Sequence, residues 1–170
     1  MARILTADTI ETTDGRTFVS DFPSGTVISS TVIRNGTRTS ISTSATGILF
    51  SGYHNKLLDR NGSYLIIRSS VFGAQYSAGN CGTGVRIGST WDYGAAYQYD
   101  GSWSSTQQTT CIYGYHIFTD VDAGSRNIEF GWNARDGGSN RPFAIFNPNN
   151  NDDARLRQII STMYVQEVIL

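Results

Sequence analysis

Two histidines, His54 and His116, are the side chains of this 170-residue chain best suited to acid–base chemistry. A hydrolytic Ser–His–Asp site would need one of them as the base and a carboxylate to orient it. The carboxylates considered for that role are Asp59, Asp92, Asp120 and Asp122. The sequence has no Gly-x-Ser-x-Gly motif to place a nucleophilic serine, and no third ligand marks a metal site at either histidine. We therefore interpret both histidines as structural and expect neither catalysis nor a bound metal.

Two oxygen-rich segments, Asp120-Val121-Asp122 and residues 149–153, have the side chains that a calcium ion accepts. Neither has the twelve-residue spacing and terminal glutamate of a calcium-binding loop. Asn and Asp also occur in loops because their side chains hydrogen-bond to nearby backbone groups. Turn chemistry is thus the preferred interpretation of both segments, and calcium is the alternative.

Near the C-terminus, two acidic residues are followed by two arginines within a short segment. A guanidinium matches the geometry of a carboxylate better than an ammonium group does, so arginine favours ion pairs here. We interpret the group as local or inter-subunit ion pairs formed by Asp152, Asp153, Arg155 and Arg157.

The glycine-rich and cysteine-containing segments do not predict a cofactor. The sequence Cys81-Gly82-Thr83-Gly84 lacks the lysine and the following helix of a phosphate-binding loop. Cys81 and Cys111 are too few and too far apart for a disulfide scaffold or a metal knuckle. One bridge between them remains an alternative, but two buried thiols that act as small apolar groups are preferred.

An aromatic cluster between residues 91 and 103 is the best candidate for contact with a ligand or partner. Sugars bind flat on aromatic faces, and the neighbouring Asp and Gln side chains could bind their hydroxyl groups. The alternative is packing, with the tyrosines on one face of a strand and the tryptophans covering a sheet edge. The cluster consists of Trp91, Tyr93, Tyr97, Tyr99 and Trp103.

The composition indicates one all-β domain. Hydrophobic residues make up 39% and charged residues 16% of the chain, which is long enough for a substantial core. Lysine occurs once, at Lys56, whereas strand-forming Thr, Val, Ile, Tyr and Phe are frequent. A net charge of −1 offers no basic field for nucleic acid, so we expect no nucleic-acid partner. The apolar stretches are too short to span a bilayer and residues 1–8 have no apolar core of a signal peptide, so neither membrane insertion nor secretion is expected.

Short apolar segments separated by Gly, Asn, Asp and Ser predict an antiparallel sandwich. Asn35-Gly36 and Asn61-Gly62 are typical of tight hairpin turns. Ile128, Phe130 and Trp132 recur at every second position, so we expect Trp132 in the core. The predicted strands are residues 26–34, 48–54, 63–71, 82–90, 110–118, 126–133, 143–146 and 159–169. A jelly roll fits this number of strands best, and only residues 152–158 are expected to form a helical turn.

The first residues differ from the rest, because their apolar side chains fit neither helical nor strand spacing. We divide the chain into an extended N-terminal arm, residues 1–24, and a jelly-roll knob, residues 25–170. Exposed apolar groups on an arm need a surface on which to be buried. The residues expected to anchor the arm are Ile4, Leu5, Ile10, Phe18, Val19 and Phe22.

Residues 17–28, Thr-Phe-Val-Ser-Asp-Phe-Pro-Ser-Gly-Thr-Val-Ile, resemble the leader into the β-domain of fibre and decoration proteins of tailed bacteriophages, especially cyanophages. Residues 140–149, 152–155 and 161–168 resemble the close of the same modules. The resemblance covers about half of the chain and its motifs are compositional. It implies a jelly-roll knob, often homotrimeric, that is displayed on a head or a tail.

The resemblance implies a structural protein on the virion surface, assembled in the host cytoplasm and without enzymatic activity. The first hypothesis is a capsid decoration or cement protein, or a short head fibre, whose arm docks on the major capsid protein or another virion protein. The second is a tail-fibre tip that recognises a host-surface glycan through the aromatic cluster, and the third is a glycan-active enzyme. Fibres usually have a long shaft before the knob, and here residues 1–24 precede it, which favours decoration.

Overall fold

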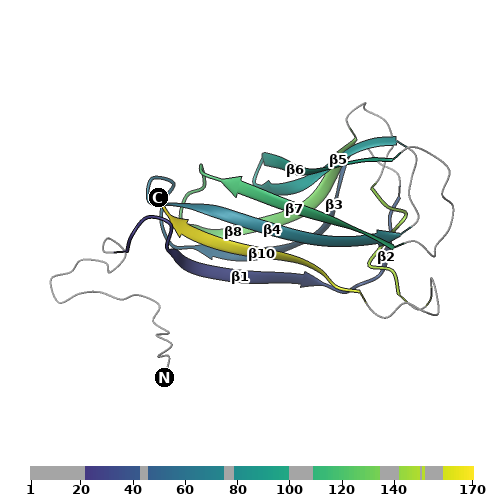
Figure 1. Ribbon diagram of the computed structural model, residues 1–170, viewed down its shortest axis with the longest axis horizontal. Helices are drawn as coiled ribbons and strands as arrows, with labels where there is room; N and C mark the ends of the chain where they lie inside the picture. The colour runs from purple at the N-terminus through teal and green to yellow at the C-terminus, as the bar shows by residue number, and fades with distance from the viewer. Residues whose placement is uncertain are drawn as a thin grey trace, which may run out of the picture.

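The computed structural model describes residues 22–42, 46–74, 79–99, 109–134, 142–149, 151 and 159–170 (Figure 1). For residues 79–81, 94–99, 109, 110 and 134 it describes the backbone alone. The described part is built of strands and contains no helix that could cross a membrane.

Ten strands, all paired antiparallel, make up the described part of the chain. They are β1 (Val27–Asn35), β2 (Thr39–Ser40), β3 (Thr46–Lys56), β4 (Ser63–Ala74), β5 (Gly79–Ile87), β6 (Thr90–Tyr99), β7 (Thr109–Phe118), β8 (Gly124–Ala134), β9 (Ile145–Phe146) and β10 (Ser161–Ile169). Most of the predicted strands correspond to one of these elements, because alternation of apolar residues and turn residues marks each of them.

The strands form two sheets that face each other. Sheet one has the order β1-β10-β4-β7, and the short β9 and β2 lie beside the far end of β4, where they continue the positions of β10 and β1. Sheet two has the order β3-β8-β5-β6. If the eight long strands are counted in chain order, the two sheets read 1-8-3-6 and 2-7-4-5, which is the connectivity of a jelly roll. The predicted all-β antiparallel jelly-roll sandwich is confirmed.

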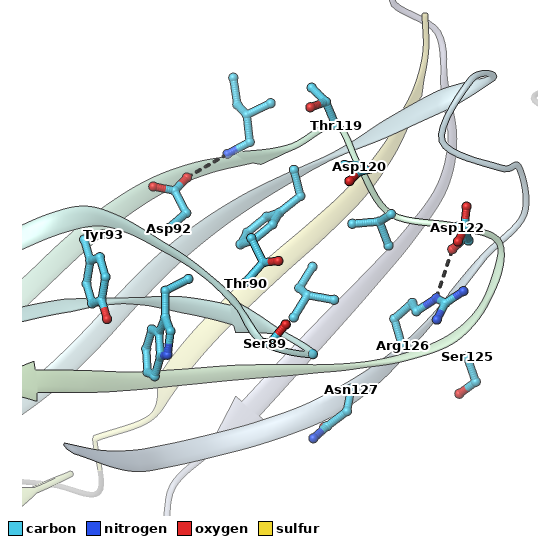
Figure 2. A pocket seen from close by; sticks show the side chains of 16 residues that line it. Ser89, Thr90, Asp92, Tyr93, Thr119, Asp120, Asp122, Ser125, Arg126 and Asn127 are labelled. Carbon is cyan, nitrogen blue, oxygen red and sulfur yellow. Dashed lines mark hydrogen bonds between the residues drawn. The ribbon is translucent and has the colours of Figure 1, made fainter.

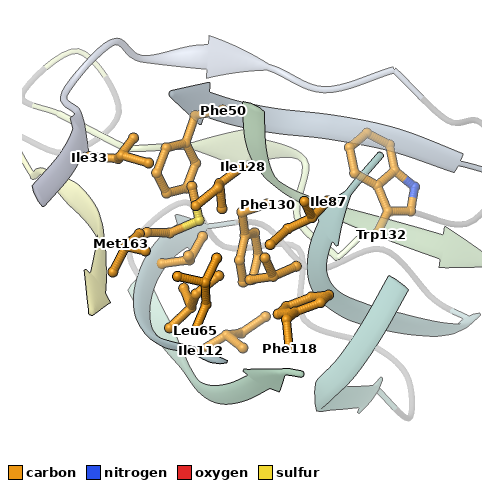
Figure 3. Close-up of a cluster of buried hydrophobic side chains, with 14 of the residues drawn as sticks. Ile33, Phe50, Leu65, Ile87, Ile112, Phe118, Ile128, Phe130, Trp132 and Met163 are labelled. Carbon is orange, nitrogen blue, oxygen red and sulfur yellow. The ribbon is translucent and has the colours of Figure 1, made fainter. Parts of the chain in front are cut away.

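The core lies between the sheets, where every second side chain of the central strands points inward (Figure 3). Phe50 of β3 stacks on Phe130 of β8, with ring centroids 6.0 Å apart, and on Phe146 of β9 at 5.7 Å. Trp132 is only 5% exposed, so its predicted burial is confirmed. Its indole lies directly over Gly47, where an added Cβ would be 2.0 Å from the ring.

Both predicted hairpin turns are wrong. After Asn35-Gly36 the chain continues along the edge of sheet one, and β1 pairs with β10 rather than with the next strand. At Asn61-Gly62 the chain passes from sheet two to sheet one, with the Gly62 amide donating to the Asp59 carbonyl at 2.9 Å. An Asn-Gly pair specifies a local change of direction, whereas strand pairing in this fold is decided by contacts between residues far apart in sequence.

A two-residue hairpin occurs instead inside the segment 82–90 that was predicted as one strand. Gly88 and Ser89 join β5 to β6, and Gly88 has a φ of +60°, a left-handed conformation that glycine adopts without steric cost. Trp91 of the predicted aromatic cluster lies on β6, immediately after this turn.

The cysteines do not form a bridge. Cys111 on β7 is a free, half-buried thiol, with its Sγ 3.3 Å from the Ser70 hydroxyl on β4. The side chain of Cys81 lies outside the described residues.

Candidate binding groove

A groove of about 780 Å³ opens at one end of the sandwich, where the β5–β6 hairpin faces the loop that joins β7 to β8 (Figure 2). Ser89, Thr90 and Asn127 contribute hydroxyl and amide groups, and Ile87 and Phe118 contribute apolar surface. The groove is therefore mixed in character, with hydrogen-bonding groups around an apolar base.

Asp92 connects the edge strands of the two sheets. It lies on β6 opposite Val85, and its Oδ2 accepts a hydrogen bond from the backbone amide of Ile117 on β7 at 3.2 Å (Figure 2). The same oxygen lies 3.7 Å from Nδ1 of His116. A side chain of sheet two thus occupies a backbone donor on the edge of sheet one.

His116 points into the sandwich and is fully buried. Neither of its ring nitrogens has a hydrogen-bond partner, and the same is true of the buried Ser69 hydroxyl. Ser69 Oγ and His116 Nε2 both lie beside Gly114, each 2.4 Å from where a Cβ would stand. Burial lowers the pKa of His116 below its usual value, and the nearby Asp92 carboxylate opposes this shift.

The fold therefore brings together Ser69, His116 and Asp92, including one His–Asp pair that the sequence analysis considered. The geometry does not suit nucleophilic catalysis, because His116 and Asp92 are beyond hydrogen-bond distance and the serine is 4% exposed. Neither Ser69 nor His116 lines the groove. The interpretation of His116 as a structural residue agrees with this burial.

Trp91 and Tyr93 form an aromatic wall at one side of the groove. Their rings are parallel within 6°, with centroids 5.3 Å apart. The guanidinium of Arg86 lies 5.4 Å from the Trp91 ring and forms an ion pair with Glu129 at 2.6 Å. The Tyr93 hydroxyl accepts a hydrogen bond from the Asn133 amide at 3.1 Å. Both ends of the wall are thus held by polar contacts, and Tyr93 stays 41% exposed.

The β3–β4 and β7–β8 loops are joined by Arg60. Its guanidinium contacts Asp120 at 2.5 Å and both carboxylate oxygens of Asp122 at 2.7 and 2.6 Å. The hydrogen bonds from Arg60 lower the pKa of Asp122 and raise that of Arg60. Asp59 adds a further link between the loops, because its Oδ1 accepts from the Ala123 amide at 3.2 Å.

This arrangement gives both aspartates of the Asp120-Val121-Asp122 segment an arginine partner. The described residues contain no group of three or more His, Cys, Asp or Glu that could hold a metal. Of the second oxygen-rich segment, Asn149 accepts a hydrogen bond from the Asn151 amide at 3.0 Å, as in a turn. Asp152 and Asp153 lie outside the described residues.

A buried polar network, which the sequence analysis missed, lies behind the same end of the sandwich. Glu167 on β10 is fully buried and accepts from the Leu57 and Leu58 amides, each at 2.8 Å. It also accepts from the hydroxyls of Ser63 at 2.7 Å and Ser29 at 3.2 Å. Four donors therefore surround a carboxylate near the end of an otherwise uncharged strand.

Lys56 supplies the positive charge of this network. Its Nζ lies 3.8 Å from Glu167 Oε1, donates to Ser63 Oγ at 2.6 Å, and also donates to the Leu58 carbonyl. Burial lowers the pKa of Lys56, and the charge of Glu167 opposes this shift. The only signals in the sequence were the single lysine of the chain and a lone glutamate near its end.

His54 completes the network at its other side. The Ser29 hydroxyl donates its hydrogen to Glu167, so the Ser29 oxygen accepts a hydrogen bond from His54 Nε2 at 3.2 Å. With its proton on Nε2, His54 accepts a hydrogen bond at Nδ1 from the Thr31 hydroxyl at 2.9 Å. Burial lowers the pKa of His54, while Glu167 raises it to a smaller degree. His54 is thus a neutral, hydrogen-bonded structural residue, as the sequence analysis proposed.

Many of the predicted contact residues lie outside the described structure. Of the residues expected to anchor the arm, only Phe22 is described, and it is 40% exposed. The backbone of Tyr97 and Tyr99 is described on β6, without their side chains. The others that lie outside the described residues are Ile4, Leu5, Ile10, Phe18, Val19, Trp103, Asp152, Asp153, Arg155 and Arg157.

No known protein family and no curated protein matches the sequence. Among solved structures, the chain is similar to the D431N mutant VP2 protein of infectious bursal disease virus in T=1 particles, with a TM-score of 0.39 and 12% identity. That alignment covers 84% of this chain and 38% of the other. A structure of the Gx strain of the same virus gives a TM-score of 0.39 and 13% identity, covering 98% of this chain and 45% of the other. The chain thus spans less than half of either protein, and likeness at this level carries no functional argument.

Proposed function

We propose that this protein is a virion structural protein of a tailed bacteriophage, in the role of a capsid decoration or cement protein. In this proposal a homotrimer of jelly-roll knobs is displayed on the virion surface after assembly in the host cytoplasm. Residues 1–24 form the arm that docks on the major capsid protein or another virion protein. The role requires no catalytic step and no cofactor.

The observation that carries the proposal is how the knob holds the segment leading to the arm. The Gly25 amide donates to the Ile169 carbonyl at 2.9 Å, and the Ile169 amide donates to the Thr26 carbonyl at 3.0 Å. The Leu170 amide donates a hydrogen bond to the Gly62 carbonyl at 3.1 Å. A domain that is anchored by its N-terminal arm bears load where the arm joins the domain. Here that junction, at Gly25 and Thr26, is hydrogen-bonded to the last strand.

The buried network lies directly behind this exit point. Glu167 precedes Ile169 by two residues on β10 and binds backbone amides of the β3–β4 loop. Arg60 joins that loop to the β7–β8 loop. Cross-links among the first strand, the last strand and two loops therefore gather at one end of the sandwich (Figure 1). This concentration supports the proposal that the knob is anchored from that end.

Docking to particles that lack the protein tests the proposal. Purified full-length protein is mixed with such particles and separated from them by sedimentation, and we expect it to sediment with them. Replacing Phe18 and Phe22 by Ser should abolish co-sedimentation without lowering the melting temperature, since both residues belong to the arm and Phe22 is 40% exposed. Ile48→Ser, at an exposed position on β3, is the control and should dock like wild type. Full docking of the Phe18/Phe22 variant would contradict the arm's role.

A second candidate function is recognition of a host-surface glycan by a tail-fibre tip. The observation in its favour is the Trp91–Tyr93 wall beside an open groove lined with hydroxyl and carboxylate groups. Glycan-array binding that is lost in Tyr93→Ala and kept in Tyr53→Ala would favour this candidate, because Tyr53 is an exposed tyrosine that does not line the groove.

A further inference from the structure

The outer face of sheet one carries a continuous group of aromatic and aliphatic side chains, which we call the tyrosine face. Its most exposed members are Tyr113, Tyr115 and Ile117 on β7, at 73%, 51% and 47%, and Val32 on β1, at 46%. Partly buried residues fill the space between them. These are Tyr64, Ile66 and Phe72 on β4 and Tyr164 on β10.

Strand register places these residues side by side. Val32 pairs with Tyr164, Tyr164 with Arg68, and Arg68 with Tyr115, so one row crosses all four strands of the sheet. The adjacent row contains Ile66, which pairs with both Gln166 and Ile117. The exposed apolar surface is therefore contiguous. Exposed apolar residues on a monomer are ordinarily scattered singly.

The outer face of sheet two has a different character. Its central row pairs Ser51 with Glu129 and Glu129 with Arg86, and the last two form an ion pair. Exposed apolar groups lie there on the two edge strands, Tyr53 and Ile48 on β3 and Tyr93 on β6, and the charged central row separates them. The charged face is suited to solvent, whereas the tyrosine face is not.

The composition of the tyrosine face matches that of a protein interface. It has four tyrosines and two arginines, Arg68 at its centre and Arg34 on β1, and no Lys, Asp or Glu among its outward positions. Tyr and Arg are enriched in interfaces, and Lys, Glu and Asp are depleted. Fully exposed aromatic side chains present about 150–250 Å² each, so the face offers on the order of 500 Å² of apolar surface. Polar neighbours such as Ser30, Ser70 and Gln166 extend it toward the roughly 800 Å² per subunit of a standard interface.

A second copy of this chain would supply binding partners for the central arginine and the tyrosine rings on this face. Arg68 lies between Tyr164 and Tyr115 in the same row, and its guanidinium is 5.9 Å from the Tyr115 ring. The face thus contains both a cation and the aromatic rings that bind cations, so a copy of the face supplies the complement of each. Extension of the sheet by edge pairing is opposed, because Asp92 already occupies the Ile117 amide on the edge of β7.

We propose that the tyrosine face is the surface through which copies of this chain pack against one another. The inference deepens the proposed function, because it assigns the contact that would hold the displayed homotrimer together. It does not depend on where on a virion the protein is attached.

Light scattering coupled to size-exclusion chromatography at micromolar concentration tests this contact. We expect the full-length chain to show three times its 18.6 kDa mass. The double variant Tyr113→Glu/Ile117→Glu should run as a monomer with an unchanged melting profile, because both side chains are exposed on the subunit. The matched control, Tyr53→Glu/Ile48→Glu, should keep the wild-type mass, since it places the same charges on the other sheet.

A wild-type monomer, or a face variant that keeps the wild-type mass, would overturn the assignment. If the glutamate variant unfolds, the single variants Tyr113→Ser and Tyr115→Ser are tested in its place. Association at least tenfold weaker than that of the wild type would support the contact, and unchanged association would contradict it. A dimer that dissociates in the face variants would support the contact and contradict the trimer. A wild-type oligomer that fails to dock on particles would contradict the decoration role alone, and a monomer that docks would contradict this inference alone.

Discussion

The ammonium group of Lys56 lies 3.8 Å from the carboxylate of Glu167, and both side chains are fully buried. Isolated charges are costly to bury, and here hydrogen bonds to backbone and hydroxyl groups surround both ions. The pair joins the end of β3 to the last strand at the point where the chain enters the knob. Removing either partner would leave an uncompensated buried charge.

The reactivity of Lys56 follows from this burial. Amine-reactive esters should acylate only the N-terminal amine of the native protein, because Lys56 is the single lysine and is 1% exposed. In denaturant the same reagent should add a second acyl group at Lys56. Peptide mass spectrometry of the two samples measures this difference, and rapid native acylation of Lys56 would contradict its burial.

The three tryptophans should differ in their effect on stability. Trp132→Ala should lower the free energy of unfolding by about 3–5 kcal/mol, because it removes a core side chain and leaves a cavity. Trp91→Ala should cost less, since Trp91 lies on the outer face of an edge strand, half-buried against Tyr93. Trp103 lies outside the described residues, and we expect its replacement to be mild as well. Denaturant unfolding of the three variants gives the order, and a Trp132→Ala variant as stable as wild type would refute the core assignment.

Stability should decrease as the pH falls below the usual pKa of histidine. Burial lowers the pKa of His54 and His116 in the folded state, so the unfolded chain takes up protons that the folded chain does not. The free energy of unfolding should therefore fall between about pH 6.5 and the lowered folded pKa values, and level off below them. Urea unfolding across this range measures the slope. His116→Leu should reduce it, and an unchanged slope in this variant would contradict a lowered pKa.

The loop contact made by Arg60 should be visible in the titration of Asp122. Hydrogen bonds from Arg60 hold the pKa of that carboxyl below its usual range. Arg60→Gln should raise it toward the ordinary value for Asp, while the melting temperature changes little because the pair is solvent-exposed. Carboxyl NMR titration of wild type and variant is the measurement. Arg38→Gln, which removes an arginine elsewhere, is the control.

The sequence was sufficient to predict the fold class and the face of β8 that packs inward. The alternation of Ile128, Phe130 and Trp132 is a local pattern, because every second side chain of a strand points to the same face of the sheet. Turn chemistry alone did not predict the partner of each strand. Asn35-Gly36 marks a change of direction in either a hairpin or a sheet crossing, so the error there has a physical cause.

The groove and the buried network could not be predicted because each combines residues from distant strands. Glu167 contacts Ser29, Leu57 and Ser63, which lie more than a hundred residues away in sequence. Asp92 was considered beside His116, but no local pattern indicated that β6 and β7 form facing sheet edges. Trp91 and Tyr93 of the predicted aromatic cluster do stack on each other, because neighbouring aromatics on one strand face are visible in the sequence, and their contact with a ligand or partner stays a prediction.

Electron cryomicroscopy of the assembled virion tests the central claim most directly. The account predicts density at the particle surface into which the two-sheet jelly roll fits, with the end that contains Gly25 and Ile169 directed toward the underlying protein. It also predicts three copies around each attachment point, with their tyrosine faces in contact. A virion map without such density, or one in which the opposite end of the sandwich faces the particle, would contradict the account.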